Sequence, residues 1–324
     1  MKIGVFNNKK VNIFLIIVGI IIFIFLPRFV SGYWVRVITT IFMYAVISQG
    51  INLMSGYMGY LPFGNAMFFG VGAYVTAIGM SKGLSFLLVL PLAALTAIFF
   101  SILFGLPVLR LRGHYFAIAT IGMSGALLAV VQNATEITGG AMGTTLPIID
   151  KSPEVTYNYF YLAMLALMVI TSLTIYLVIK SKFGFGIRSI KANEEAANSM
   201  GINTTYHKVI AWAISALFTS IAGALYAYWM SFIGPDEVFD IMIAINTIVI
   251  MLIGGAGSIL GPIIGAFVIS LLSEVVWSTF LEYHLAVLGI TIIIIVFFVP
   301  KGITGTIADF VKKRELRLRK KVSV

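Results

Sequence analysis

The sequence predicts an all-α integral membrane protein, built as a polytopic helix bundle with about ten membrane spans, some of them discontinuous. Composition is the first reason, because 60% of the 324 residues are hydrophobic, only 10% are charged and the mean hydropathy is +1.04. Soluble domains carry about 25% charged residues, so composition excludes a soluble fold. The second reason is a series of apolar stretches near the length of about 20 residues that a membrane helix needs.

These stretches predict spans over residues 11–27, 34–55, 60–80, 85–109, 114–131, 158–180, 208–232, 241–256, 258–277 and 285–300. Lysines precede the first stretch, and Pro27-Arg28 follows it in place of a small-residue cleavage site, which predicts an uncleaved helix rather than a signal peptide. At two places the sequence predicts a broken or re-entrant helix. Residues 59–72 are rich in glycine and contain Pro62, and residues 254–257 read Gly-Gly-Ala-Gly.

Loop charge predicts the orientation of the spans. Segment 180–208 is basic, whereas segments 132–157 and 233–240 are acidic. The positive-inside rule therefore places 180–208 and both termini in the cytoplasm, which an even number of spans permits. Arg28 and Arg36 fall on the outer side as local exceptions.

The same reasoning gives one transmembrane domain, residues 1–311, followed by a basic cytoplasmic tail, residues 312–324. We expect this tail to lie along membrane lipid. The net charge of +10 does not indicate nucleic acid binding, because the basic residues lie at span ends and in the tail.

A small polar segment stands out within the basic loop at about 180–208. Glu195, Ala196, Ala197 and Gly201 have an E-A-A-x-x-x-G spacing, which resembles the coupling segment with which permeases of ABC importers meet their ATPases. Small alanines permit close approach of a partner, glycine lets the chain turn away, and Glu195 offers a polar contact. These residues alone equally permit a solvated loop helix.

Uncharged polar residues inside the predicted spans are the candidates for lining a translocation path. A zwitterionic solute needs donors and acceptors, which amides, hydroxyls and broken helix ends supply. The alternative is hydrogen bonding between helices. The candidates are Ser48, Gln49, Asn52, Asn65, Asn246 and Thr247. Separately, the four-residue spacing of Gly257, Gly261 and Gly265 predicts a helix face for close packing.

Other chemistry finds little support. There is no cysteine, no H-E-x-x-H and no G-x-x-x-x-G-K motif, so we expect no metal site and no cofactor or ATP site in this chain. Ionisable residues are sparse within the spans, which argues against a proton-coupled carrier. Residues 122–125 match the G-x-S-G of intramembrane serine proteases, but none of the three histidines falls clearly at the depth of Ser124. We expect a non-enzyme.

Several motifs, in order along about residues 50–305, resemble those of the branched-chain amino acid ABC-transporter permeases, in particular the M-type of their two permease subunits. The matching blocks are residues 56–74, 109–120, 186–203, 222–226, 254–262 and 300–305. Asn65 stands where that family usually has histidine, and His114 stands where it often has aspartate or a similar polar residue.

The resemblance implies a permease subunit that helps move leucine, isoleucine and valine across the bacterial cytoplasmic membrane. Its partners would be a second homologous permease, two cytoplasmic ATPases that bind ATP and magnesium, and an extracytoplasmic solute-binding protein. The segment from Glu195 to Gly201 would then be the ATPase contact. Permeases for urea, amides and other amino acids share the wider family, so these solutes remain alternatives, as does a stand-alone secondary carrier.

Overall fold

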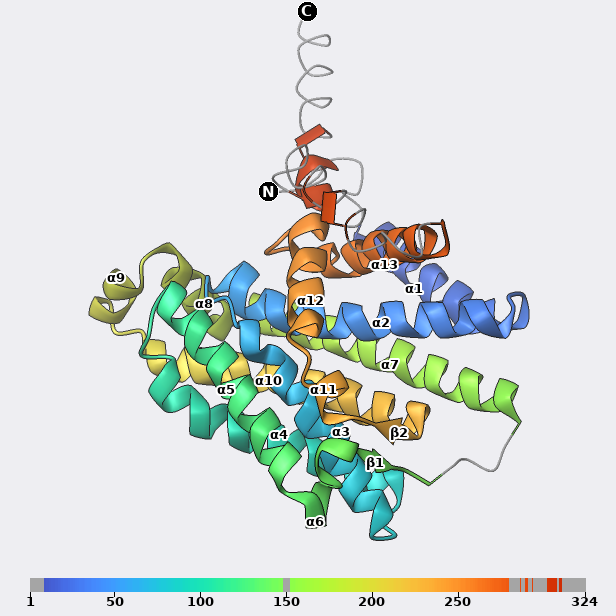
Figure 1. Cartoon of the computed structure of the whole chain (residues 1–324). Coiled ribbons are helices and arrows are strands. Elements are labelled where there is room, and N and C mark those ends of the chain that lie inside the picture. Colours follow the sequence, from blue (N-terminus) through green and yellow to red (C-terminus); the bar gives the residue numbers. More distant parts are fainter. Residues whose placement is uncertain are drawn as a thin grey trace, which may run out of the picture.

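The computed structural model describes residues 9–147 and 152–279, together with positions 286, 289, 290, 293, 302–307, 309 and 310. It confirms the all-α polytopic fold (Figure 1). The longer helices are α1 (Lys9–Phe25), α2 (Gly32–Asn52), α3 (Ala66–Ser81), α4 (Phe86–Val108), α5 (His114–Asn133), α7 (Pro153–Lys180), α8 (Lys182–Ala192), α10 (Thr204–Met230), α12 (Ile241–Gly254) and α13 (Gly261–Thr279). Short elements are α6 (Thr135–Thr138), α9 (Glu194–Ser199), α11 (Pro235–Val238), β1 (Thr144–Thr145) and β2 (Phe232–Ile233).

Seven helical segments in the described ranges are long and apolar enough to cross a membrane, and two shorter apolar helices cover Ile17–Arg28 and Gly261–Val276. These segments correspond to the first nine predicted spans. The tenth, residues 285–300, lies outside the described residues except at positions 286, 289, 290 and 293, and so does the tail 312–324.

Helix α10 lies at the centre of the bundle. It packs against α3 and α4 on one side and α2 on the other, while α7, α12 and α13 pack around α2 (Figure 1). Glycines permit the closest of these contacts. A Cβ on Gly223 of α10 would lie 2.1 Å from the Phe69 carbonyl oxygen, and one on Gly72 of α3 would lie 1.9 Å from the Ser220 carbonyl oxygen. Helix backbones approach this closely only where side chains are absent.

Burial separates the inner helices from the outer ones. Of the 18 consecutive residues that are most apolar in the α2 segment, 83% are buried, compared with 22% for the corresponding residues of α5. Helix α5 instead directs apolar side chains such as Ile118 and Val130 outward. An exposed apolar surface on a span-length helix is suited to lipid or to another membrane subunit.

Both predicted interruptions lie between helices. Helix α2 continues into a π-helical turn, η3 (Leu53–Tyr57), and the chain then runs through residues 58–62 and the 3₁₀ turn η4 (Phe63–Asn65) before α3 begins. Helix α12 ends at Gly254, and Gly255 has φ +118°, so the chain reverses before α13. π-Helical turns are frequent at functional sites.

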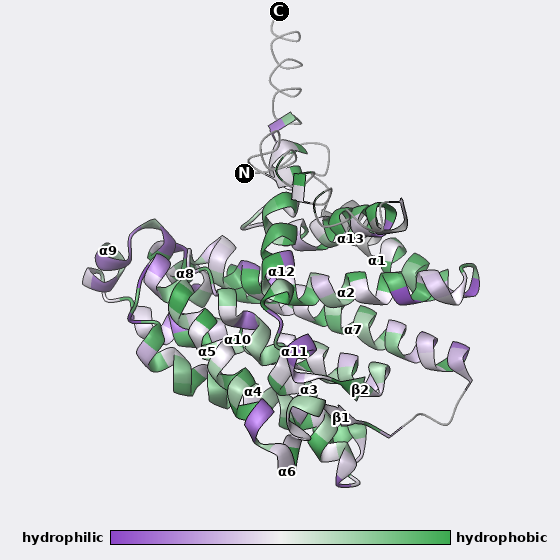
Figure 2. Ribbon diagram, viewed as in Figure 1, coloured by the Kyte–Doolittle hydropathy of each residue, from purple (hydrophilic) through white to green (hydrophobic). Residues whose placement is uncertain are grey.

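The two ends of the bundle differ in character. At one end lie α8 and α9, where hydrophilic residues concentrate (Figure 2). At the other end β1 pairs antiparallel with β2, which joins the loop after α5 to the loop after α10 near α11 (Figure 1). We call these the α9 end and the β end.

Candidate functional site

Side-chain caps set the boundaries of α8, α9 and α10. Ser181, Asn193 and Asn203 each precede a helix and accept a hydrogen bond from a backbone N–H three residues later, at 3.4, 3.0 and 2.9 Å. Such caps satisfy N–H groups that the first helical turn leaves free. The segment between α7 and α10 therefore folds as two short, separately capped helices rather than as a loop.

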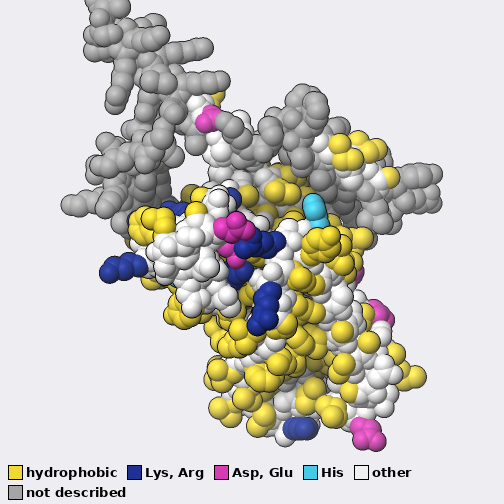
Figure 3. All heavy atoms as spheres, turned by 90° about the vertical axis from the view of Figure 1, so that its left-hand side faces the viewer, with side chains coloured by type: hydrophobic (Ala, Val, Ile, Leu, Met, Phe, Trp, Pro, Cys, Tyr) yellow, Lys and Arg dark blue, Asp and Glu magenta, His cyan; other side chains and the backbone are white. Residues whose placement is uncertain are grey.

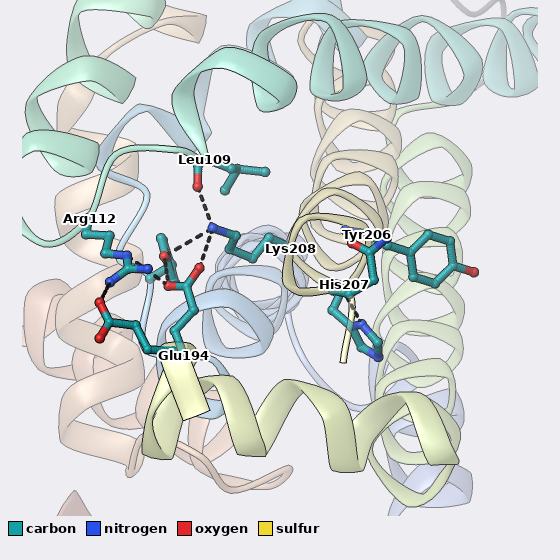
Figure 4. A network of polar contacts seen from close by, with 9 residues as sticks. Leu109, Arg112, Glu194, Tyr206, His207 and Lys208 are labelled. Atoms are coloured by element: carbon teal, nitrogen blue, oxygen red, sulfur yellow. Dashed lines mark hydrogen bonds and ion pairs between the residues drawn. The ribbon is translucent and has the colours of Figure 1, made fainter. Parts of the chain in front are cut away.

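Glu194, the first residue of α9, is the hub of a polar network (Figure 4). Its Oε1 accepts a hydrogen bond from Nζ of Lys208 at 2.8 Å, and its Oε2 accepts one from the hydroxyl of Tyr60 and lies 3.4 Å from Nε of Arg112. Lys208 Nζ also donates to the carbonyl of Leu109 at 2.6 Å. The network thus joins α9 to the first turns of α10 and to the loops before α3 and α5.

The network is largely shielded from solvent, since the side chains of Lys208 and Glu194 are 5% and 13% exposed. Burial on its own raises the pKa of Glu194. Hydrogen bonds from Lys208 and Tyr60 and the charges of Lys208 and Arg112 outweigh burial, so the pKa lies below its ordinary value of 4.5. Glu194 is therefore ionised at neutral pH. Removing one partner of such a pair leaves a buried charge uncompensated.

Helix α8 holds the same turn of α10 from a second side. The rings of Phe183 and His207 stack at 4.7 Å, with 10° between their planes. Gly186 makes room for the histidine, because a Cβ there would lie 2.3 Å from Nε2 of His207. Lys191 Nζ also donates to the carbonyl of Gly56 in the π-helical turn at 2.5 Å. Movement of α8–α9 would therefore reach α10 and the end of α2 directly.

Three of the four predicted coupling residues, Glu195, Ala196 and Ala197, lie on α9 and differ in exposure, and Gly201 follows the helix. The Glu195 side chain is 79% exposed and pairs with Nη1 of Arg112 at 2.9 Å. Ala196 is exposed, whereas Ala197 is 3% exposed and packs against the bundle. Gly201 has φ +86° and lies in open space, so it ends the segment by its backbone conformation. Glu195, Ala196 and Gly201 form the accessible part.

Sequence reasoning missed the anchoring residues Glu194 and Lys208. A signal was present, because Lys208 falls at the beginning of a predicted span and Glu194 begins a run of two acids fourteen residues earlier. Their other partners, Tyr60 and Leu109, come from distant loops, and the sequence does not reveal that proximity.

Among the predicted path residues, Gln49, Asn65 and Thr247 lie within the bundle. Gln49 Nε2 donates to Oγ of Ser172 at 2.8 Å, Asn65 Nδ2 donates to Oγ1 of Thr219 at 3.2 Å, and the Thr247 hydroxyl donates to a carbonyl one turn earlier in α12 at 2.8 Å. All three are at most 2% exposed. In this conformation they connect helices or cap a helix's own carbonyl rather than face open space.

Asn52 fastens the junction between α12 and α13 to the end of α2. Its Oδ1 accepts the N–H of Gly257 at 2.7 Å, and its Nδ2 donates to the carbonyl of Ser258 at 2.8 Å. Gly56 lies against the same contact, since a Cβ there would come within 2.5 Å of the Gly257 nitrogen. We refer to Asn52, Gly257 and Ser258 as the inner clamp, because they lie towards the α9 end.

Asn246, the fifth predicted path residue, lines a cavity of about 900 Å³ towards the β end. The cavity lies among α2, α10, α12 and α13. This volume falls within the range of about 300–1,000 Å³ that is typical of ligand sites.

The three predicted packing glycines occupy two kinds of position. Gly261 and Gly265 lie in the first two turns of α13, and a Cβ on Gly265 would come 2.0 Å from the carbonyl oxygen of Ile250 in α12. Gly257 lies before the helix with φ +77°, and a Cβ there would lie 3.1 Å from the carbonyl oxygen of Gly56. The expected single helix face therefore applies to two of them, because the chain reverses between Gly254 and Gly261.

Comparison with known proteins decides the family. The model of the branched-chain amino acid transport system permease component matches residues 33–296. The chain belongs to this family. It is 30% identical to the high-affinity branched-chain amino acid permease LivM of Salmonella typhimurium, and 29% identical to LivM of Escherichia coli, over 86% of this chain and 71% of each relative. LivH of S. typhimurium is 26% identical over 81% of this chain and 91% of that protein. No solved structure is significantly similar.

Asn65 and His114, the two positions where the resemblance predicts a departure from the family pattern, do not line the cavity. Asn65 is fully buried and bonded between α3 and α10, and His114 is the exposed first residue of α5. Ser124 of the G-x-S-G match lies ten residues further along α5, about 15 Å from His114 along the helix axis. That spacing does not bring the two side chains together.

Proposed function

We propose that the permease is one of two homologous membrane subunits of an ATP-driven importer that carries leucine, isoleucine and valine into the bacterial cytoplasm. Two ATPases would dock on its cytoplasmic side and bind the ATP and magnesium, and an extracytoplasmic binding protein would deliver the solute. The relatives named LivM and LivH are permease proteins of high-affinity branched-chain amino acid transport systems, which supports the choice of solute and a second permease.

The observation that carries this proposal is the α8–α9 segment. It is anchored to α10 through Glu194 and Lys208, yet its outer face is free for a partner. Met200 is 84% exposed and Phe185 is 63% exposed, both outside the span-length helices. Figure 3 shows charged side chains gathered beside apolar ones on the face that contains this end. Apolar anchors rimmed by charge are typical of protein interfaces.

Charge supports a cytoplasmic position for the α9 end. Lys182, Arg188 and Lys191 lie on α8, whereas Asp236, Glu237 and Asp240 lie near β2 at the opposite end. The positive-inside rule then favours a cytoplasmic position for the α9 end, and we expect both termini on the same side.

We infer a mechanism of alternating access. ATP binding would close the ATPase pair and move α8–α9, and the Glu194–Lys208 contact would transmit that movement to α10. Because α10 packs against α2, α3 and α4, its displacement would rearrange the bundle around the solute. Coupling of this kind requires a two-state element that is biased from both sides.

The test is to tag the permease, solubilise native membranes gently and identify the co-purifying polypeptides by mass spectrometry. The proposal expects a P-loop ATPase and a homologous permease, and it expects ATP-dependent leucine uptake after reconstitution with the binding protein. Leucine uptake by the permease alone in liposomes would contradict it and support a secondary carrier. Uptake of urea or amides in preference to leucine by the complete complex would overturn the choice of solute.

A further inference from the structure

The cavity towards the β end combines exposed charged side chains with buried apolar ones. Its exposed charged side chains, which we call the rim, are Arg36, Glu237 and Asp240, and its buried apolar side chains, which we call the floor, include Met43, Phe69 and Ile250. Arg36 and Met43 are seven residues apart on α2, which corresponds to about 10 Å along the helix. A single small molecule can therefore reach from the charged rim to the apolar floor.

The rim holds both signs of charge in fixed positions. Glu237 accepts a hydrogen bond from the hydroxyl of Tyr226, and Oδ1 of Asp240 accepts the N–H of Met242 at 2.9 Å, capping α12. Arg36 stands on the facing helix α2, with its guanidinium 5.6 Å from the ring centre of Tyr157. Opposite charges across one opening can bind the carboxylate and the ammonium of a zwitterion simultaneously.

The floor offers an apolar surface within the bundle. Ile250, Phe69 and Met43 are at most 4% exposed, although each contributes to the cavity wall. Towards the α9 end, the inner clamp binds the α12–α13 junction to α2. The arrangement is accessible from the β end and fastened at the α9 end, as an outward-facing binding site requires.

We propose that this cavity binds an amino acid with an apolar side chain, its carboxylate at Arg36, its ammonium at Asp240 and its side chain on the floor around Met43. This inference rests on the proposed function and adds a solute site within this subunit. The floor residues are uncharged. An aliphatic solute side chain fits this surface, whereas a basic or acidic one would be buried there without a partner.

The experiment measures equilibrium binding to the purified permease–ATPase complex in nanodiscs, without ATP and without the binding protein. The probes are leucine, leucinol, which lacks the carboxylate, and 4-methylpentanoate, which lacks the amine. We expect saturable leucine binding and weaker binding of both analogues. In Arg36→Gln the preference for leucine over leucinol should fall about tenfold or more, the loss expected for a hydrogen bond to a charged group.

Two further variants sharpen the test. Asp240→Asn keeps a capping side chain at the start of α12 and should lose the preference for leucine over 4-methylpentanoate instead. Arg28→Gln is the matched control, because Arg28 is an arginine before α2 that does not line the cavity. It should leave all ratios unchanged. Each ratio is measured within one preparation, so partial loss of folded protein does not alter it.

Absence of saturable leucine binding, or unchanged ratios in Arg36→Gln and Asp240→Asn, would overturn the proposed site. These outcomes differ from a failure of the proposed function. In that case the complete wild-type system, with its binding protein and ATP, would not take up leucine at all.

Discussion

The two ends of the permease use polar side chains in opposite ways. At the α9 end, Glu194 pairs with Lys208 and joins α9 to α10, and Asn52 bonds to Gly257, which lies 205 residues further along the chain. Towards the β end, Arg36 and Asn246 line an open cavity. Polar side chains in a membrane bundle therefore have two separate uses. Satisfied groups hold the bundle closed, and groups directed into open space are available to a solute.

The largest expected effect comes from removing the buried cation. Lys208→Met leaves the buried carboxylate of Glu194 without its buried cationic partner, which should destabilise the permease by about 3–5 kcal/mol and abolish uptake. Arg36→Gln, at the outer cavity, should change stability by less than about 1 kcal/mol. Thermal unfolding in detergent, followed by tryptophan fluorescence, compares the two.

The double variant Glu194→Gln/Lys208→Met then separates charge from packing. Because it removes both charges, it should recover much of the stability lost in Lys208→Met. Equal stability of Lys208→Met and Arg36→Gln would remove the distinction between the two ends.

A smaller effect is expected where α13 approaches α12. Gly265→Ala places a methyl group 2.0 Å from a backbone oxygen, which should cost about 2–3 kcal/mol and lower the yield of folded permease. Gly122→Ala on α5 is the control, since a Cβ there meets no atom within 4 Å. Size-exclusion profiles of the two variants provide the measurement, and identical profiles would refute the close packing.

Replacing Asn52 and Asn246 in turn compares the same change, asparagine to alanine, at the two ends of the permease. Asn52→Ala removes two hydrogen bonds from the inner clamp and should destabilise the permease by about 1–2 kcal/mol, with raised ATP hydrolysis uncoupled from uptake. Asn246→Ala faces the cavity and should change stability by less than about 0.5 kcal/mol while lowering uptake. The reverse pattern would mean that the assignments of clamp and cavity are exchanged.

The smallest expected effect concerns pH. Because the pKa of Glu194 lies below 4.5 in the folded protein, its contribution to stability is present above the unfolded pKa and is lost as the pH falls through the folded value. Between about pH 6 and 8 this carboxylate should stay ionised. The unfolding temperatures of wild type and Glu194→Gln should therefore differ by a constant amount in that range. Convergence of the two curves within that range would place the pKa near neutrality.

Much of the fold was predictable because span length and hydropathy are local properties. The interruption at Gly254–Gly257 was visible for the same reason, since glycine permits the positive φ that Gly255 and Gly257 adopt. The pairing of β1 with β2 was not predictable from the sequence, because it joins two short segments from loops about ninety residues apart.

For the functional residues too, the location of a segment was predictable from the sequence, whereas the direction of its side chains was not. The predicted coupling segment is a separate capped helix, and its location followed from composition. Which of its residues faces inward depends on the contact of Glu194 with Lys208 and Tyr60, which tertiary packing creates. Likewise, Gln49, Asn65 and Asn246 are similar polar residues in sequence, but packing directs the first two at other helices and the third at the cavity.

The central claim, that α9 is the docking segment for an ATPase, can be tested by cross-linking because the chain contains no cysteine. Ala196→Cys and Ala197→Cys place single thiols on adjacent residues, the first exposed and the second 3% exposed. In the native complex, a short thiol cross-linker should join Ala196→Cys, and not Ala197→Cys, to the ATPase subunit. A co-purifying ATPase that cross-links to neither variant, or to both equally, would contradict the account.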